Sequence, residues 1–195
     1  MNNNKSLTTE ETFNLAVKNH QEGKTDIAQK LYNQVLKIDP NHSQALNNLG
    51  NIFQDLGEHQ KAKDCYEKAI EISPDYVDAH YNLGNMFKNL GEHQKAKDCY
   101  EKAIEIDPNH VDAHNNLGNI FHKLGENQKA KDCYEKVIEI DPNHVTAHWN
   151  SHGLSTDIDE ALSILKKLYK IDNKHTKAKI MIAALEGYNG NFSMF

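Results

Sequence analysis

The chain of 195 residues contains no arginine, so all 22 of its basic residues are lysine. Arginine's planar guanidinium grips phosphates in a bidentate manner, and its absence together with a net charge of −6 argues against a nucleic-acid partner. No apolar run approaches the ~18 residues that a membrane span needs, so we expect no membrane partner. The segment Met1–Lys5 lacks the apolar stretch of a secretory signal, and we therefore expect a cytoplasmic protein.

Cysteine is scarce, and Cys65, Cys99 and Cys133 are one position repeated at equal intervals along the chain. Equivalent residues on stacked helices lie ~10 Å apart, whereas a disulfide needs Cα atoms within ~7 Å. We therefore expect no disulfide and no shared metal. These thiols are interpreted as half-buried small apolar groups.

Repetition is what the chain has in abundance. The segments 43–76, 77–110 and 111–144 align without a gap, and the last two are identical at 28 of 34 positions. A repeat of this length is typical of a helix–turn–helix unit that buries its apolar face by stacking on its neighbours. Glycine recurs in the middle of each unit and proline near its end: Gly23, Gly57, Gly91 and Gly125; Pro40, Pro74, Pro108 and Pro142.

The residues inside each unit resemble the tetratricopeptide repeat (TPR) family. One unit reads Leu49-Gly50-x2-Phe53, Ala62-x3-Tyr66 and Pro74, and the next two units repeat this pattern. The family's leading tryptophan is replaced by Leu46, His80 or His114. The resemblance implies an all-α fold, a TPR solenoid in which antiparallel helix pairs form a right-handed superhelix.

The repeat pattern predicts the organisation of the chain. Thr8 and Glu11 form a capping-box pattern that starts the first helix at Thr9. Three residues are missing around 151–156, which predicts a short first helix in the fifth repeat, and Gly190 falls at the turn position of a sixth. The expected segments are a disordered leader at 1–8, repeats at 9–42, 43–76, 77–110 and 111–144, a degenerate repeat at 145–175 and a partial repeat at 176–195.

The first helix of each unit carries a polar face opposite its packing stripe. The resemblance assigns this face to the wall of a concave groove, and Asn82 and Asn116 are expected to point away from the packing. Asparagine recurs there at a constant step, and an amide offers a donor and an acceptor to a peptide backbone. The candidate peptide-binding residues are Asn48, Asn51, Asp55, Asp78, Asn82, Asn85, Asn89, Asp112, Asn116, Asn119, Lys123 and Asn150.

Two interpretations of these asparagines stand side by side. The row resembles the asparagine ladder in the TPR arm of O-linked N-acetylglucosamine transferases, which implies sequence-tolerant peptide binding. The alternative is that asparagine is a polar filler copied by duplication and partly structural between repeats. Acidic C-termini of chaperones are poor candidate ligands, because a groove of amides and aspartates with few lysines repels a carboxylate.

The chemistry-bearing residues show no pattern of a catalytic site. His144, His148 and His152 lie one helical turn apart, but no carboxylate completes a metal set, and structural roles are the preferred interpretation. No nucleophile motif or phosphate-binding glycine loop is present. We expect no enzyme activity in this segment, no metal and no cofactor.

The sequence therefore predicts a protein-interaction module that holds an extended or helical segment of a protein ligand in its groove. The alternative is that the chain is the substrate-recruiting or dimerising arm of a larger transferase whose catalytic domain follows residue 195. Ile180, Met181, Ile182 and Leu185 make a strongly apolar last helix, followed by Tyr188, Phe192 and Phe195. We expect self-association through this end of the chain.

Overall fold

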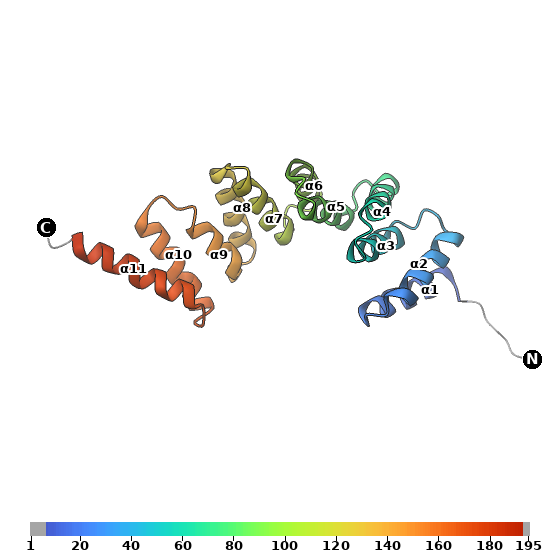
Figure 1. The fold of residues 1–195 in the computed structure, drawn as a ribbon, viewed down its shortest axis with the longest axis horizontal. Helices are drawn as coiled ribbons and strands as arrows, with labels where there is room; N and C mark the ends of the chain where they lie inside the picture. The colour runs from blue at the N-terminus through green and yellow to red at the C-terminus, as the bar shows by residue number, and fades with distance from the viewer. Residues whose placement is uncertain (1–6, 193–195) are drawn as a thin grey trace, which may run out of the picture. The chain divides into compact units, whose positions relative to one another are not determined.

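The computed structural model describes residues 7–192, and their side chains up to residue 187. Every regular element in this range is an α-helix (Figure 1). The chain divides into two compact units, at residues 1–106 and 107–195. The helices of the first unit are α1 Thr9–Gln21, α2 Thr25–Ile38, α3 Ser43–Asp55, α4 His59–Ile72, α5 Val77–Asn89 and α6 His93–Ile106. Those of the second are α7 Val111–Lys123, α8 Asn127–Ile140, α9 Val145–His152, α10 Ile158–Ile171 and α11 Thr176–Phe192.

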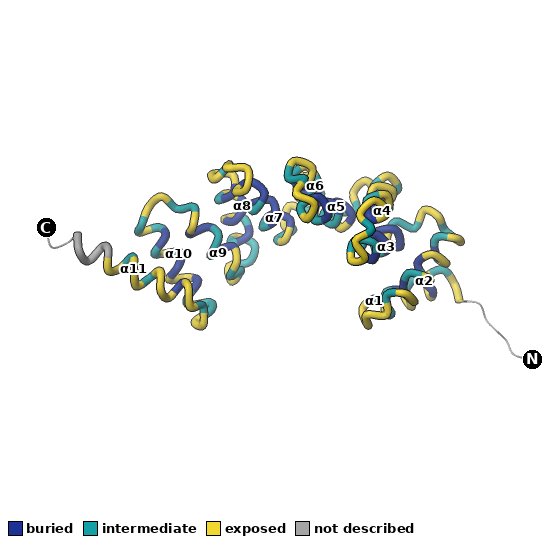
Figure 2. Tube along the Cα trace, in the orientation of Figure 1, coloured by how far each residue is buried: buried dark blue, intermediate teal, exposed yellow. Residues whose placement is uncertain are grey.

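Within each unit, consecutive helices pair as hairpins, and each first helix also packs on the second helix of the preceding pair. In both units the buried residues follow the faces where helices meet, and the outer faces are exposed (Figure 2). The chain is thus an all-α solenoid. Residues 1–6 of the expected leader lie outside the described residues.

The helix ends follow local chemistry that the sequence announces. The Thr8 hydroxyl accepts from the Glu11 amide at 3.1 Å, while the Glu11 carboxylate accepts from the Thr8 amide at 2.8 Å, and the first helix begins at Thr9 as predicted. At the turns within the first four pairs, Gly23, Gly57, Gly91 and Gly125 have φ between 73° and 79°. Only glycine adopts this left-handed conformation without strain, which explains the period of these residues.

Histidine begins several of the first helices, a role that the sequence reading missed. The Nδ1 atom of His144 accepts from the Ala147 amide at 3.0 Å, and so satisfies one of the amides that a helix start leaves unpaired. The same cap recurs at His42, His110 and His175. Each of these histidines stands immediately before the first residue of its helix, which is the position where an acceptor side chain is most useful.

A tyrosine column forms the centre of the packing inside the regular pairs. Tyr66, Tyr100 and Tyr134 on the second helices are buried, and each ring lies against a glycine of the first helix. A Cβ atom built on Gly50 would stand 2.6 Å from the Tyr66 ring, and Gly84 and Gly118 are similarly close to their tyrosines. The Leu-Gly pair of the repeat therefore makes room for the aromatic ring that follows in the next helix.

The fifth pair exchanges both members of this contact. His152 stands one repeat after Gly118 in the glycine column, and Leu165 stands where α8 has Tyr134. Leu165 is completely buried, and His152 is 8% exposed. In this pair the second helix carries Leu165, which is smaller than tyrosine, and the first helix carries His152, which is larger than glycine. The predicted shortening is confirmed, because α9 has 8 residues against 13 in α7.

The turn predicted at Gly190 is wrong, since α11 runs without interruption from Thr176 to Phe192. This helix packs on α10 through Ala178, Ile182 and Leu185, which contact a cluster around Leu165 and Leu168. Ile180 lies on the opposite face and is 62% exposed. The side chains of Tyr188, Phe192 and Phe195, which entered the prediction of self-association, lie outside the described residues.

No helix within residues 7–192 is both long and apolar enough to span a bilayer.

Alanine substitutions at two glycines should change the free energy of unfolding in opposite directions. Gly50→Ala should lower the free energy of unfolding by about 1–3 kcal/mol, because the added methyl overlaps the Tyr66 ring. Gly187→Ala is the matched control in α11, where a Cβ meets nothing within 4 Å. That change should raise stability by about 0.5–1 kcal/mol through helix propensity alone. Thermal unfolding followed by circular dichroism measures both, and a stabilised Gly50→Ala variant would contradict the packing argument.

Candidate functional site

The predicted groove residues all lie on the first helices, but they differ in exposure. Those that are exposed are Asp55, Asp78, Asn89, Asp112 and Lys123. Those that are half-buried are Asn48, Asn51, Asn82, Asn85, Asn119 and Asn150. Asn116 is only 9% exposed, so the expectation that it points away from the packing is wrong.

One row of asparagines, Asn51, Asn85 and Asn119, is bonded to the core. The hydroxyls of Tyr66, Tyr100 and Tyr134 donate to the carboxamide oxygens of Asn51, Asn85 and Asn119, at 2.7, 2.8 and 2.8 Å. Burial raises the pKa of Tyr134 to about 12, so this phenol keeps its proton and remains a donor. The contacts of these three oxygens support the interpretation that asparagine is structural here, and not the interpretation that these oxygens bind a ligand.

The other row, Asn48, Asn82, Asn116 and Asn150, also contributes hydrogen bonds between neighbouring helix pairs. The Asn82 amide nitrogen donates to the oxygen of Asn47 at 3.0 Å, and that of Asn150 donates to the oxygen of Asn119 at 3.2 Å. Asn82 therefore contributes to repeat stacking, contrary to the expectation that it points away from the packing. A helical wheel places a residue on a face but does not show which side chain of the adjacent helix it meets.

The first pair lacks the tyrosine–asparagine bond. Val17 occupies the position that Asn51 holds in the next repeat, and the buried Tyr32 hydroxyl has no hydrogen-bond partner among the described residues. Burial raises the pKa of Tyr32, and the side chain of Asn48 lowers it by less without reaching normal bonding geometry. Because valine stands at the asparagine position of the repeat, the missing hydrogen bond of Tyr32 could have been predicted from the sequence.

A lysine on the second helix covers the aromatic residue of the first in three pairs. Lys61, Lys95 and Lys129 lie 5.1–5.3 Å from the ring centroids of Phe53, Phe87 and Phe121. Each lysine also pairs with the glutamate three residues before it. These exposed contacts brace the turn between the helices, and each contributes modestly.

The histidines and cysteines have structural surroundings. The Nε2 atoms of His80, His114 and His148 donate to the carbonyls of Pro74, Pro108 and Pro142 at 2.8–2.9 Å. These rings replace the family's leading tryptophan and tie each first helix to the preceding turn. Burial raises the pKa of Cys65 to about 11 and that of Cys99 to about 12, which leaves little reactive thiolate. In the described part of the chain, no three metal-ligating side chains are grouped to hold an ion.

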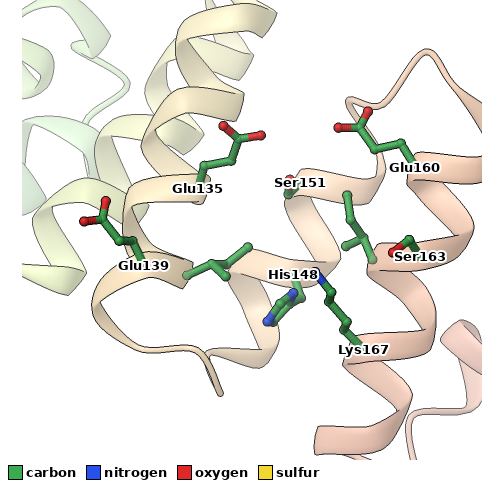
Figure 3. Close-up of a pocket in the computed structure, with 9 residues that line it drawn as sticks. Glu135, Glu139, His148, Ser151, Glu160, Ser163 and Lys167 are labelled. Carbon is green, nitrogen blue, oxygen red and sulfur yellow. The ribbon is translucent and has the colours of Figure 1, made fainter.

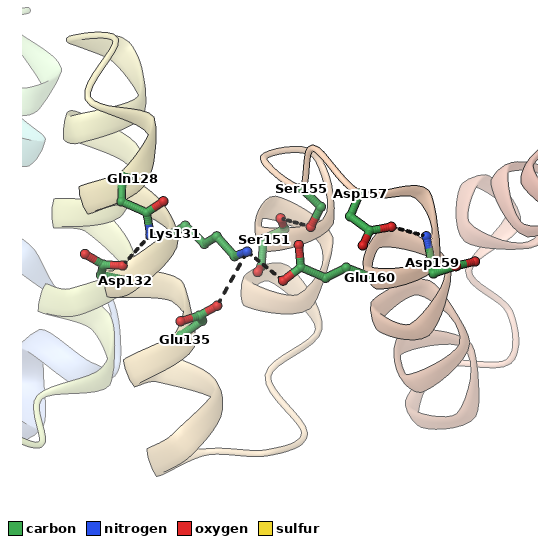
Figure 4. Close-up of polar contacts among 9 residues, drawn as sticks. All are labelled: Gln128, Lys131, Asp132, Glu135, Ser151, Ser155, Asp157, Asp159 and Glu160. Carbon is green, nitrogen blue, oxygen red and sulfur yellow. Dashed lines mark hydrogen bonds and ion pairs between the residues drawn. The ribbon is translucent and has the colours of Figure 1, made fainter.

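A cleft of about 450 Å³ lies among α8, α9 and α10 (Figure 3). Two of its lining residues meet at Lys131, whose ammonium donates to Glu160 at 2.6 Å and lies 3.9 Å from Glu135 (Figure 4). The hydrogen bond from Lys131 lowers the pKa of the Glu160 carboxyl. Lys129 stands at the position of Glu160 in the preceding pair, so this bridge is particular to the junction with the short α9.

A smaller pocket of about 280 Å³ lies in the second unit beside the asparagine side chains of Asn119 and Asn150, which are called the amide row below. It has an aromatic and imidazole wall and an amide rim, and it includes two of the predicted groove residues. Its lining residues are Asn119, His122, Tyr134, Trp149, Asn150, His152, Gly153 and Leu154. The sequence reading missed this pocket, although the lost residues around 151–156 mark its place.

The helix pairs and their polar first-helix faces define a helical-repeat scaffold. Models of the tetratricopeptide repeat match residues 77–110 and 111–144, and further TPR models match 13–42, 31–64 and 50–91. The chain belongs to the tetratricopeptide repeat family. No curated protein sequence matches it.

Solved structures resemble the chain over most of its length. A crystal structure of the MamA protein is 30% identical, with a TM-score of 0.72, and covers 87% of this chain and 94% of its own. YrrB, described as a TPR protein with an unusual peptide-binding site, is 24% identical with a TM-score of 0.71, at coverages of 88% and 90%. The pilF protein of Pseudomonas aeruginosa is 18% identical with a TM-score of 0.81, at coverages of 95% and 86%. The latter two likenesses concern the fold alone.

The tyrosine column yields a paired test. Tyr66→Phe removes a hydroxyl that donates to Asn51 at 2.7 Å and also lies 3.2 Å from the Gln54 oxygen. The loss of one such bond should lower the free energy of unfolding by about 1 kcal/mol. Tyr32→Phe should be neutral or slightly stabilising, because it removes a buried hydroxyl without a partner. Both rings are fully buried, so the packing change is matched. Urea unfolding of the two variants measures the difference, and equal losses would show that the hydroxyl bond does not matter.

Proposed function

We propose that the chain is a protein-interaction module whose first helices bind an extended segment of a partner protein through its backbone. The observation that carries the proposal is that six of the groove carboxamides are half-buried and that most of these six are held by internal hydrogen bonds. A carboxamide has two N–H donors and one oxygen acceptor, so one internal bond fixes its plane and leaves further hydrogen-bonding capacity. Fixed groups lose little entropy when they bind, which favours affinity.

The charge of the surface favours a neutral or basic partner segment. Among the candidate residues, Asp55, Asp78 and Asp112 are exposed, and Lys123 is the single cation. Each unit carries its own section of this surface, on α3 and α5 in the first and on α7 and α9 in the second. The description of YrrB as a protein with a peptide-binding site supports this mode of binding by fold-level analogy only.

The test begins with peptides selected from a random display library on the full chain. If the backbone is what is recognised, N-methylation of an individual peptide amide should weaken binding about two- to tenfold for each N–H donor that is lost, whereas most alanine substitutions in the peptide should not. Fluorescence anisotropy measures both series. Binding that is insensitive to N-methylation, or an absence of selected peptides, would overturn the proposal.

The matching protein variant is Asn48→Ala with Asn82→Ala, which removes two groove amides of the first unit. We expect binding to fall about tenfold or more. Asn82→Ala alone also measures the stability cost of its bond to Asn47, which thermal unfolding separates from binding. Asn33→Ala is the control, because Asn33 is exposed on the second helix α2 and donates only to the Gln29 carbonyl. Equal affinity of the double variant and the control would exclude a role for the amides.

Self-association through the last helix is a second proposal, favoured by the exposure of Ile180 and Met181. Ile182 is half-buried against α10, so substituting it would disturb the fold and not only the surface. Ile180→Lys is therefore the appropriate change. Light scattering should show the wild type associating at high concentration and the variant remaining smaller. A wild type that stays monomeric would refute this proposal.

A further inference from the structure

The pocket beside the amide row arises from the shortening of the fifth pair. The helix α9 ends at His152, and the chain turns away through Gly153 and Leu154, whose amide donates to the Ser151 carbonyl at 3.1 Å. The His152 ring folds back, so that its centroid lies 4.4 Å from the Trp149 ring and its Nδ1 bonds the Trp149 carbonyl. In the longer first helices, a further helical turn occupies the position of this turn.

The lining of the pocket suits a flat, uncharged group. Trp149, His122 and His152 contribute ring atoms to the lining, and no carboxylate or ammonium belongs to it. The Trp149 ring also packs against His152 and His175, at centroid distances of 4.4 and 5.0 Å, so an incoming ring meets only the part of the indole that these two rings leave open. The Asn119 oxygen accepts hydrogen bonds from both Tyr134 and Asn150, so it already has two donors and needs no charged partner from a ligand. A volume of about 280 Å³ lies at or below the lower end of the ~300–1,000 Å³ usual for small-molecule sites, which favours a single side chain over a cofactor.

We propose that this pocket receives one aromatic side chain of the bound segment. The inference rests on the proposed peptide binding and deepens it: the amide row bonds the peptide backbone irrespective of sequence, and the pocket selects a residue and so sets the register. Rings stack favourably on indole and imidazole in offset or tilted geometry. Backbone bonds for affinity combined with a pocket for specificity is a recurring arrangement in peptide recognition.

The experiment uses the full chain and two degenerate peptide libraries that differ only in a fixed central residue, phenylalanine or alanine. We expect the phenylalanine library to bind about tenfold more tightly or better, because burying the ring adds apolar area. Trp149 is the single tryptophan, so its fluorescence reports occupancy of the pocket directly. It should change with the phenylalanine library and with N-acetyl-phenylalaninamide, but not with N-acetyl-glutamine amide.

A filling variant tests the pocket without damaging the fold. Gly153 lines the pocket in ordinary right-handed helical geometry, and a Cβ there meets only the Asn150 carbonyl at 3.6 Å, an ordinary contact. Gly153→Leu should abolish the preference for phenylalanine, so that the two libraries bind the variant with equal affinity. Gly187→Leu, in the open surroundings of α11, is the control and should keep the preference.

The outcomes separate the two proposals. If both libraries bind equally and Gly153→Leu has no effect, the aromatic pocket is refuted and backbone binding stands. If neither library binds, the proposed function fails. N-acetyl-phenylalaninamide then decides the pocket alone, since a fluorescence change that Gly153→Leu removes supports it and no change refutes it.

Discussion

The contact between a tyrosine ring and a glycine sets the geometry of each regular helix pair. The ring of Tyr66 lies directly on α3 because Gly50 has no side chain, and its hydroxyl reaches the Asn51 carboxamide. One residue thus connects the buried interior to the polar face of the first helix. In the first pair Ala16 stands at the glycine position, and Tyr32 is still buried in the same cluster. Where the first pair carries Val17 in place of asparagine, the ring remains buried but the hydroxyl bond is lost.

The proposed binding surface follows from this contact. Its amides are not independent surface groups, since the tyrosines and the amides of neighbouring pairs hold several of them in position. A surface built in this way is ordered before any ligand arrives, so little conformational entropy remains to be lost. Because of that order, substituting an amide such as Asn82 affects both stability and binding, and the two must be measured separately.

The sequence predicts the local structure well because glycine and the capping box act through the backbone of a few residues. The start at Thr9 is of this kind, whereas the short α9 is predicted from the three residues missing around 151–156. The turn expected at Gly190 is wrong because α11 continues through it to Phe192. Glycine permits the left-handed turn that Gly57 makes but does not require it, so its place in the repeat is not sufficient to end a helix. The partner of Asn51 and the burial of Asn116 depend on the distance between helices, and neither periodicity nor a helical wheel contains that distance.

The exchange of glycine and tyrosine for His152 and Leu165 also bears on how the chain avoids folding out of register. The segments 77–110 and 111–144 are nearly identical, so a first helix of one could pair with a second helix of the other during folding. The fifth pair differs from those segments at this contact, because His152 stands where they have glycine and Leu165 where they have tyrosine. Its two helices therefore lack the sequence identity that would let them exchange with the helices of the neighbouring repeats.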